Sequence, residues 1–168
     1  MKYNNNLAVA YAKKYALTPN KEYHFINPKK DDIGDDCANF ISQCLYAGGC
    51  PLLYSPYPWF YKKLNHHPFY SASLNWTVAH SLYWFLKSNG EINGYGVKAK
   101  EIKDISKLVL GDLIFFADLN NHVFHSSIIT KFTDEGIPLI SQHSYNKLDT
   151  PIREEYYKLN IHYLKIFL

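Results

Sequence analysis

The stretch "GDDCANFISQCLYAGG", residues 34–49, decides how the fold of this chain is interpreted. Apolar side chains recur in it at the spacing of one helical face. They belong to Cys37, Phe40, Ile41, Cys44 and Leu45. Two glycines, Gly48 and Gly49, then supply the usual C-terminal cap. The stretch therefore predicts a helix over residues 37–47 that begins at a cysteine.

The place of Cys37 at the start of this helix gives it two alternative roles. A thiol there meets the unpaired N–H groups of the first turn and the positive end of the helix dipole, which both favour the thiolate. The same N–H groups can stabilise a developing oxyanion. Cysteine is also often a small buried residue, and the anions Asp35 and Asp36 would disfavour a thiolate. The residues leave both roles open, a nucleophile and a core side chain.

Helical and strand patterns occupy different halves of the chain. Residues 4–17 and 75–88 predict two more helices, the first with Leu7 among its core-facing side chains. The aromatic, proline-containing segment that follows residue 50 predicts a long loop. From residue 108, short β-rich runs separated by turn residues predict strands. Helices followed by antiparallel strands indicate an α+β fold, and 168 residues fit one domain, residues 1–168.

Two histidines in the predicted strands could serve a cysteine nucleophile, which needs a base and a group that orients it. His125 opens "HSSIIT", where Ile129 shares its strand face, and His143 lies in the next strand, in "ISQHS". Gln142 and His143 point to opposite faces, so we expect one of the two to reach the His125 ring. The other histidines are expected at the surface or in aromatic clusters. They are His24, His66, His67, His80 and His162.

A zinc site is a competing interpretation of the same histidines. His122, His125 and His143 with Asp112 would form a His-rich ligand set. His122 and His125 are three residues apart, however, which does not place both on one strand face. The three cysteines form no CxxC pair, and their odd number leaves at least one thiol free.

Composition limits the expected partners. The net charge of +3 permits an anionic partner but no basic stripe indicates nucleic acid. No apolar run reaches the roughly 18 residues that suggest a membrane span. The opening residues lack the long apolar core of a signal peptide, so we expect a cytoplasmic protein, a fragment, or export by another route. The oligomeric state stays open.

The motif residues resemble those of the putative amidase domain family, which is related to the NlpC/P60 and CHAP cysteine peptidases and amidases. The resemblance rests on "DCANFISQCLYAGG", on "LVLGDLIFF" and on "HSSIIT", which occur in the family's order. It implies a papain-like α+β fold in which Cys37 is the nucleophile and His125 the base. His143 is the expected third catalytic residue, with Gln142 or Asn146 as alternatives. Candidate substrate or oxyanion contacts are Asp36, Asn39, Trp59 and Trp76.

The resemblance implies a cysteine hydrolase that cleaves an amide bond through a thioester, without a cofactor. A peptide or a peptidoglycan stem peptide is the expected substrate, and transfer of the acyl group to another acceptor is a variant of the same chemistry. A metal-dependent hydrolase and a catalytically inactive binding module are the two alternatives.

Overall fold

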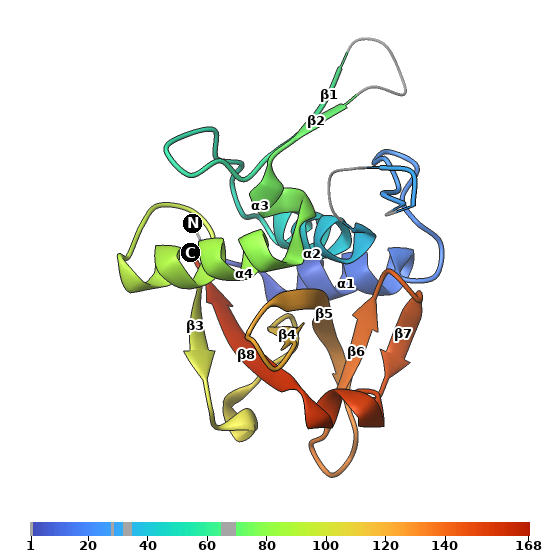
Figure 1. The fold of residues 1–168 in the computed structure, drawn as a ribbon. Helices are drawn as coiled ribbons and strands as arrows, with labels where there is room; N and C mark the ends of the chain where they lie inside the picture. The colour runs from blue at the N-terminus through green and yellow to red at the C-terminus, as the bar shows by residue number, and fades with distance from the viewer. Residues whose placement is uncertain (1, 28, 32–34, 65–69) are drawn as a thin grey trace.

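The computed structural model describes residues 2–27, 29–31, 35–64 and 70–168, and within them the chain is an α+β protein. The sheet is flanked on one face by the helices, and a small hairpin projects beyond them (Figure 1). The helices are α1 Asn5–Tyr15, α2 Asp36–Ala47, α3 Leu74–Thr77 and α4 Ala79–Glu91. The strands are β1 Tyr61–Lys63, β2 Tyr70–Ala72, β3 Lys98–Ile102, β4 Leu113–Ala117, β5 Val123–Phe132, β6 Pro138–Gln142, β7 Lys147–Thr150 and β8 Asn160–Phe167. The α+β prediction is confirmed.

The main sheet has six strands in the order β3-β8-β4-β5-β6-β7, and every neighbouring pair is antiparallel. The register of β4 against β5 pairs Phe115 with Ser126 and Phe116 with His125. Paired residues of neighbouring strands share a face of the sheet. This register therefore puts Ser126 and His125 on opposite faces.

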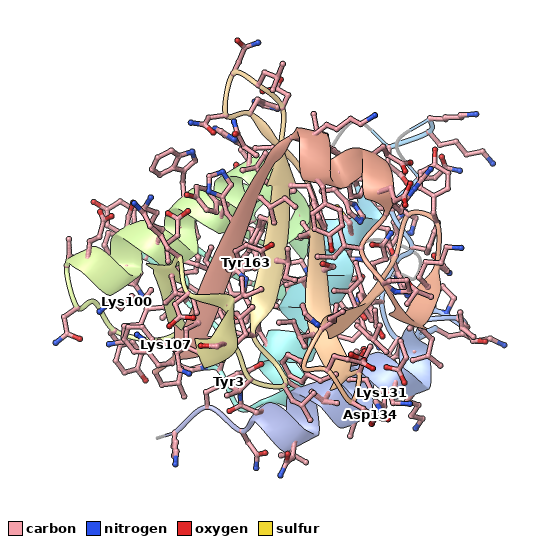
Figure 2. The ribbon with its side chains drawn as sticks, turned by 90° about the horizontal axis from the view of Figure 1, so that it is seen from below. Tyr3, Lys100, Lys107, Lys131, Asp134 and Tyr163 are labelled. Atoms are coloured by element: carbon pink, nitrogen blue, oxygen red, sulfur yellow. The ribbon has the colours of Figure 1, made fainter. Side chains whose placement is uncertain are left out.

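Two apolar clusters cover the two faces of the sheet. The larger one joins Phe115 and Ile128 of the sheet to the helices, and it includes Cys37. The smaller one, on the face seen in Figure 2, contains Phe116 and Ile129. Tyr163, labelled in the same view, packs against this second cluster. Each strand residue is thus directed either towards the helices or away from them.

Helix α2 lies in the larger cluster, and nearly all of its side chains are buried. Its C-cap is Gly48, and Gly49 follows with a φ of 89°, a left-handed conformation that glycine adopts without strain. The prediction of a helix from the cysteine to the glycine pair is confirmed.

Helix α1 is capped by Asn4, but one prediction for its core face is wrong. The Asn4 side chain accepts a hydrogen bond from the Leu7 N–H at 3.1 Å. Leu7 itself is 54% exposed, whereas Ala8, Val9 and Ala12 are buried. Small alanines face α2 because they let the two helices approach closely, and Leu7 falls on the outer side of that contact.

Several elements differ from the predicted pattern. The helix expected at 75–88 is two helices, α3 and α4, separated by Val78 in an extended conformation. Part of the predicted loop after residue 50 forms the hairpin of β1 and β2. Strands β3 and β7 were not predicted, because both are short and their apolar alternation is weak. Within the described ranges, no helix combines the length and the apolar character needed to cross a membrane.

Candidate functional site

Cys37 is the second residue of α2 and is completely buried. Asp35 caps the helix, and its carboxylate accepts the Asp36 N–H at 2.6 Å. The Ser144 hydroxyl donates to the same Asp35 oxygen, so the β6–β7 turn is tied to the helix start. Cys44 lies about two turns further along the same helix, also buried. Both thiols are therefore buried, but only Cys37 lies at the helix N-terminus.

Burial raises the pKa of the Cys37 thiol to about 12, and the negative charge of Asp35 adds to this rise. The Ser126 hydroxyl and N–H and the Ala38 N–H lie near the sulfur and favour the thiolate, but they do not offset burial. The desolvation of a fully buried sulfur outweighs the first-turn donors.

His125 lies next to Ser126 in β5, with its ring on the other face of the sheet. The ring centroid is 5.7 Å from that of Phe116 and 6.2 Å from that of Tyr156. Burial lowers the pKa of His125, and a hydrogen bond with the Gln142 side chain partly opposes this. Its Nε2 atom is buried and has no hydrogen-bond partner among the described residues. His125 is therefore a neutral ring at neutral pH with one nitrogen unused.

Ser126, which lies next to the Cys37 thiol, and His125 both lie beyond the end of the β5–β6 ladder, on opposite faces of β5. The ladder extends from the pair Phe132 and Pro138 to the pair Ile128 and Ser141, and Ser126 lies beyond that last pair. The charge of Asp35 raises the pKa of both Cys37 and His125. Tyr156 also lies near both groups, since its ring contacts His125 and its pKa is raised in part by Cys37. Both groups therefore lie near Asp35 and Tyr156, from opposite faces of β5.

His143 has a different environment from His125. Its Nδ1 hydrogen-bonds to the Asp36 carboxylate, and its Nε2 donates to the Tyr15 carbonyl oxygen at 2.9 Å. Its ring stacks on Phe40 with a centroid distance of 4.1 Å. Both ring nitrogens are therefore engaged, and His143 joins α1, α2 and β6. The structure brings Gln142, and not His143, to His125, while Asn146 lies in the β6–β7 turn.

The candidate substrate residues are buried and hydrogen-bonded to one another. The Asp36 carboxylate accepts the Asn39 side-chain N–H at 2.8 Å, and Asn39 Oδ1 accepts the Trp76 indole N–H at 2.9 Å. The Ser42 hydroxyl donates to the Trp76 carbonyl oxygen at 3.0 Å and accepts the Trp59 indole N–H at 3.1 Å. The polar residues of the motif therefore fix α2 to α3 and to the segment before β1. None of these four candidate side chains, Asp36, Asn39, Trp59 and Trp76, is exposed.

The structure does not assemble the alternative zinc ligands. His122 stacks on His80 at a centroid distance of 4.6 Å, whereas His143 is engaged by Asp36. Asp112 accepts the N–H groups of Val109 and Ile166. No group of three or more His, Cys, Asp or Glu side chains among the described residues has the arrangement of a metal site.

The remaining histidines that the structure describes lie in polar and aromatic contacts, as predicted. His24 bonds to Asp31 and stacks on Tyr70, and His162 bonds to Glu101. His66 and His67 lie outside the described residues.

Sequence reasoning missed Ser126, Tyr156 and the cap contact of Ser144. Ser126 directly follows the candidate base His125 in the strand. Because successive strand residues point to opposite faces, this position could have indicated that Ser126 faces the helices when His125 does not. Tyr156 comes from the short 3-10 helix η2, Glu154–Lys158, and no local pattern connects it to Cys37.

Comparison with known proteins gives one family and two relatives. A family model described as "Putative amidase domain" matches residues 2–164. YhbB of Bacillus subtilis (strain 168), described as an uncharacterized protein, is 34% identical over 143 residues, which are 83% of this chain and 40% of YhbB. YjcM of the same organism, described in the same way, is 31% identical over 159 residues, 89% of this chain and 32% of YjcM. This chain therefore spans less than half of either relative, and no solved structure matches it.

Proposed function

Because this chain belongs to the putative amidase domain family, we propose that it hydrolyses an amide bond with Cys37 as nucleophile and His125 as general base. One observation carries the proposal. The thiol at the first turn of α2 lies beside Ser126, the residue next to His125, and the buried Nε2 of His125 has no partner among the described residues. A buried polar atom without a partner is uncommon, and it is a ready acceptor for the thiol proton.

The first half of the reaction forms a thioester. His125 Nε2 takes the proton of Cys37 as Sγ attacks the carbonyl carbon, and the carbonyl oxygen becomes an oxyanion. The tetrahedral intermediate then collapses, the C–N bond breaks, and the imidazolium gives its proton to the leaving amine. The first-turn N–H groups of α2 and the Ser126 N–H are the donors available for the oxyanion. Water then attacks the thioester, its proton passes through His125 to the sulfur, and the acid is released.

The raised pKa of the thiol and the lowered pKa of His125 make the resting pair neutral rather than a thiolate–imidazolium pair. Proton transfer therefore accompanies attack, and the Nε2 atom must come within about 3 Å of its partner when substrate binds. In structures without substrate, the hydrogen-bond distances between catalytic groups are commonly longer than this.

Gln142 orients His125 in this scheme, because its side chain is the hydrogen-bond partner of the ring. His143 acts as a positioning residue: with Asp36 it fixes the start of α2, and thereby the thiol, relative to β6. Asn39, Trp59 and Trp76 support the same helix from its other side.

The substrate class that we propose is a peptide amide, including peptidoglycan stem peptides, with acyl transfer as a variant of the second step. We also propose that residues 1–168 form one papain-like catalytic domain. The arrangement of the chain supports this proposal. Cys37 lies at the N-terminus of a helix, and that helix packs against an antiparallel sheet that carries His125.

Peptide hydrolysis by the intact protein tests the function. Synthetic stem tetrapeptide amides and unrelated peptide amides are incubated with the protein, and the products are measured by mass spectrometry. We expect cleavage that falls at least about 10³-fold in Cys37→Ala and persists in Cys44→Ala, the matched cysteine of the same helix. Activity that survives Cys37→Ala and disappears with a chelator would defeat the cysteine mechanism.

A catalytically inactive binding module is the second candidate, and the complete burial of Cys37 with its raised pKa favours it. Alkylation by iodoacetamide separates the two. Preferential labelling of Cys37 over Cys44 near neutral pH, reduced in His125→Leu, supports the hydrolase. Equally slow labelling of both cysteines that does not change in that variant supports the binding module.

A further inference from the structure

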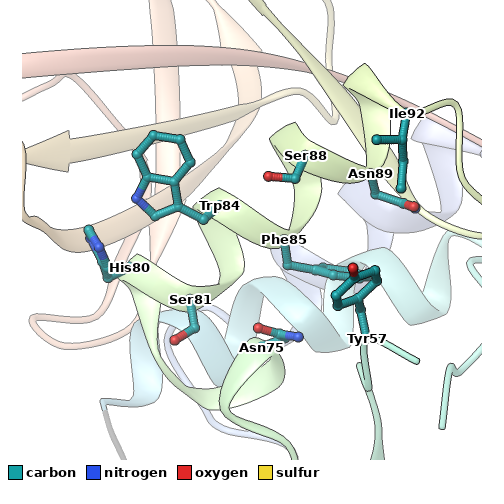
Figure 3. A pocket seen from close by; sticks show the side chains of 9 residues that line it. All are labelled: Tyr57, Asn75, His80, Ser81, Trp84, Phe85, Ser88, Asn89 and Ile92. Carbon is teal, nitrogen blue, oxygen red and sulfur yellow. The ribbon is translucent and has the colours of Figure 1, made fainter. Parts of the chain in front are cut away.

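A pocket of about 460 Å³ lies on the outer side of α4, apart from Cys37. This volume falls within the range of about 300–1,000 Å³ that is usual for small-ligand sites. Figure 3 shows its walls, with Trp84 at one side and Tyr57 beside Phe85 at the other. The lining residues come from α3, α4 and the loop before β1, and are Tyr57, Asn75, His80, Ser81, Trp84, Phe85, Ser88, Asn89 and Ile92.

Among the residues that the structure describes, the lining contains no acidic residue, lysine or arginine, yet it is rich in neutral hydrogen-bonding groups. Asn75 donates its side-chain N–H to the Pro58 carbonyl oxygen at 2.9 Å, which leaves its Oδ1 as an acceptor. His80 Nδ1 accepts the Val123 N–H at 3.1 Å, so a neutral His80 carries its hydrogen on Nε2 as a donor. Ser81 and Ser88 add hydroxyls, which both donate and accept.

Two aromatic side chains of the pocket, Trp84 and Tyr57, are exposed, whereas Phe85 between them and the core is buried. Trp84 is 45% exposed and Tyr57 is 62% exposed, whereas Trp59 and Trp76 are completely buried. A buried indole contributes to the core, but an exposed indole beside a pocket offers a flat apolar surface with a polar edge. A ligand for this pocket must therefore have an apolar face and neutral hydroxyl or amide groups around its edge.

We propose that this pocket binds a neutral saccharide, with one sugar ring against Trp84 and its hydroxyls on Asn75, Ser81 and His80. A sugar ring has an apolar C–H face and a rim of hydroxyls, which matches these walls. A charged ligand would lose hydration without gaining a free opposite charge, because Lys87, whose Nζ lies 5.4 Å from the Trp84 ring centroid, is paired with Glu101. A purely apolar ligand would bury the hydroxyls and the Asn75 oxygen without partners.

The pocket and the thiol site lie on two sides of the α3–α4 corner. The Asp35 N–H donates to the Thr77 carbonyl oxygen at 3.3 Å, so the helix that provides Asn75 also contacts the residue that caps α2. The saccharide proposal does not depend on catalysis by Cys37. Cys37→Ala is expected to bind the saccharide as the unaltered protein does.

Quenching of tryptophan fluorescence by acrylamide tests the proposal directly. Of the three tryptophans, Trp84 is the exposed one, so quenching reports on this pocket. Chitotriose, cellotriose and maltotriose are titrated, and we expect at least one to protect Trp84 saturably. Tyr57→Ala and Ser81→Ala are expected to weaken binding by about three- to tenfold, and Tyr157→Ala, an equally exposed tyrosine outside the pocket, to leave it unchanged.

Absence of protection by all three trisaccharides would overturn the proposal, as would equal binding by Tyr57→Ala, Ser81→Ala and the unaltered protein. Protection by indole with none by any saccharide would assign the pocket to an apolar ligand instead. Comparison of N-acetylglucosamine with chitotriose, and of glucose with cellotriose and maltotriose, distinguishes a free sugar from a glycan chain. Unchanged thermal unfolding of each variant excludes loss of the fold as the cause.

Discussion

His125 and His143 lie on neighbouring segments of one sheet, yet their surroundings differ in almost every respect. His143 faces the helices, stacks on Phe40, and has both ring nitrogens engaged. His125 faces the other side, and its Nε2 has no partner in the described part of the chain. A fully bonded histidine stabilises the fold, whereas a histidine with an unused nitrogen has a lone pair or proton to exchange. The hydrogen-bond partners of each ring, rather than its position in the sequence, therefore separate the two roles.

Replacement of His125 by leucine is expected to have the largest effect. Loss of the general base lowers the rate of amide hydrolysis by about 10²–10⁴-fold. Stability changes by less than about 1 kcal/mol, because a buried nitrogen without a partner is replaced by an apolar group of similar volume. Hydrolysis rates and urea unfolding measure the two quantities. A rate close to that of the unaltered protein would remove His125 from the mechanism.

The same replacement at His143 is expected to act on stability instead. His143→Leu leaves the buried Asp36 carboxylate unpaired, which costs about 3–5 kcal/mol of unfolding free energy. Urea unfolding checks this value, and the double variant with Asp36→Asn should regain part of the loss. If His143→Leu were as stable as the unaltered protein but inactive, the two histidines would have the reverse of the roles assigned here.

Replacement of Gln142 by leucine is expected to have a smaller effect on the reaction. The Gln142 hydrogen bond raises the pKa of His125, so its loss lowers that pKa further. The acid limb of the pH–rate profile then moves to lower pH, and the maximal rate falls about tenfold as the ring loses its orientation. A pH–rate profile measures both effects. An unchanged profile would mean that Gln142 does not orient the ring.

The pH dependence of stability is expected to show the smallest difference. The folded-state pKa of His125 is lowered below the ordinary value of about 6.5, so the unfolded chain takes up this proton first as the pH falls. The contribution of His125 to stability is therefore complete above pH 6.5 and decreases below it. Urea unfolding between pH 7.5 and about pH 5 should show a shallower decrease for His125→Leu. A parallel decrease in both proteins would contradict the burial assigned to the ring.

Strong periodic patterns in the sequence predicted the elements around the site. The helix that begins at Cys37 and the strand that begins near His125 are both present, because each has a clear apolar repeat and a turn or glycine signal at its end. The α3–α4 break at Val78 was not predicted, since no proline or glycine marks it. The hairpin of β1 and β2 was also missed, because its three-residue strands are too short for a recognisable alternation.

The candidate site was predicted in its residue types but only partly in its geometry. Cys37, His125 and Gln142 were all identified as candidates or alternatives, and Gln142 and His143 point to opposite faces as expected. Asp36, Asn39, Trp59 and Trp76 form internal hydrogen bonds, which local spacing does not reveal because most of their partners are 17–107 residues away.

The local pattern of apolar residues was sufficient to predict which side chains share a face, because strand alternation and the helical repeat are local properties of the backbone. Alternation does not specify which face of a strand is turned towards a helix. Only the packing of α2 on the sheet put Ser126 against the thiol and turned His125 to the other side. Packing also decided the protonation of Cys37, since desolvation depends on every atom that surrounds the sulfur and not on its position at the start of the helix.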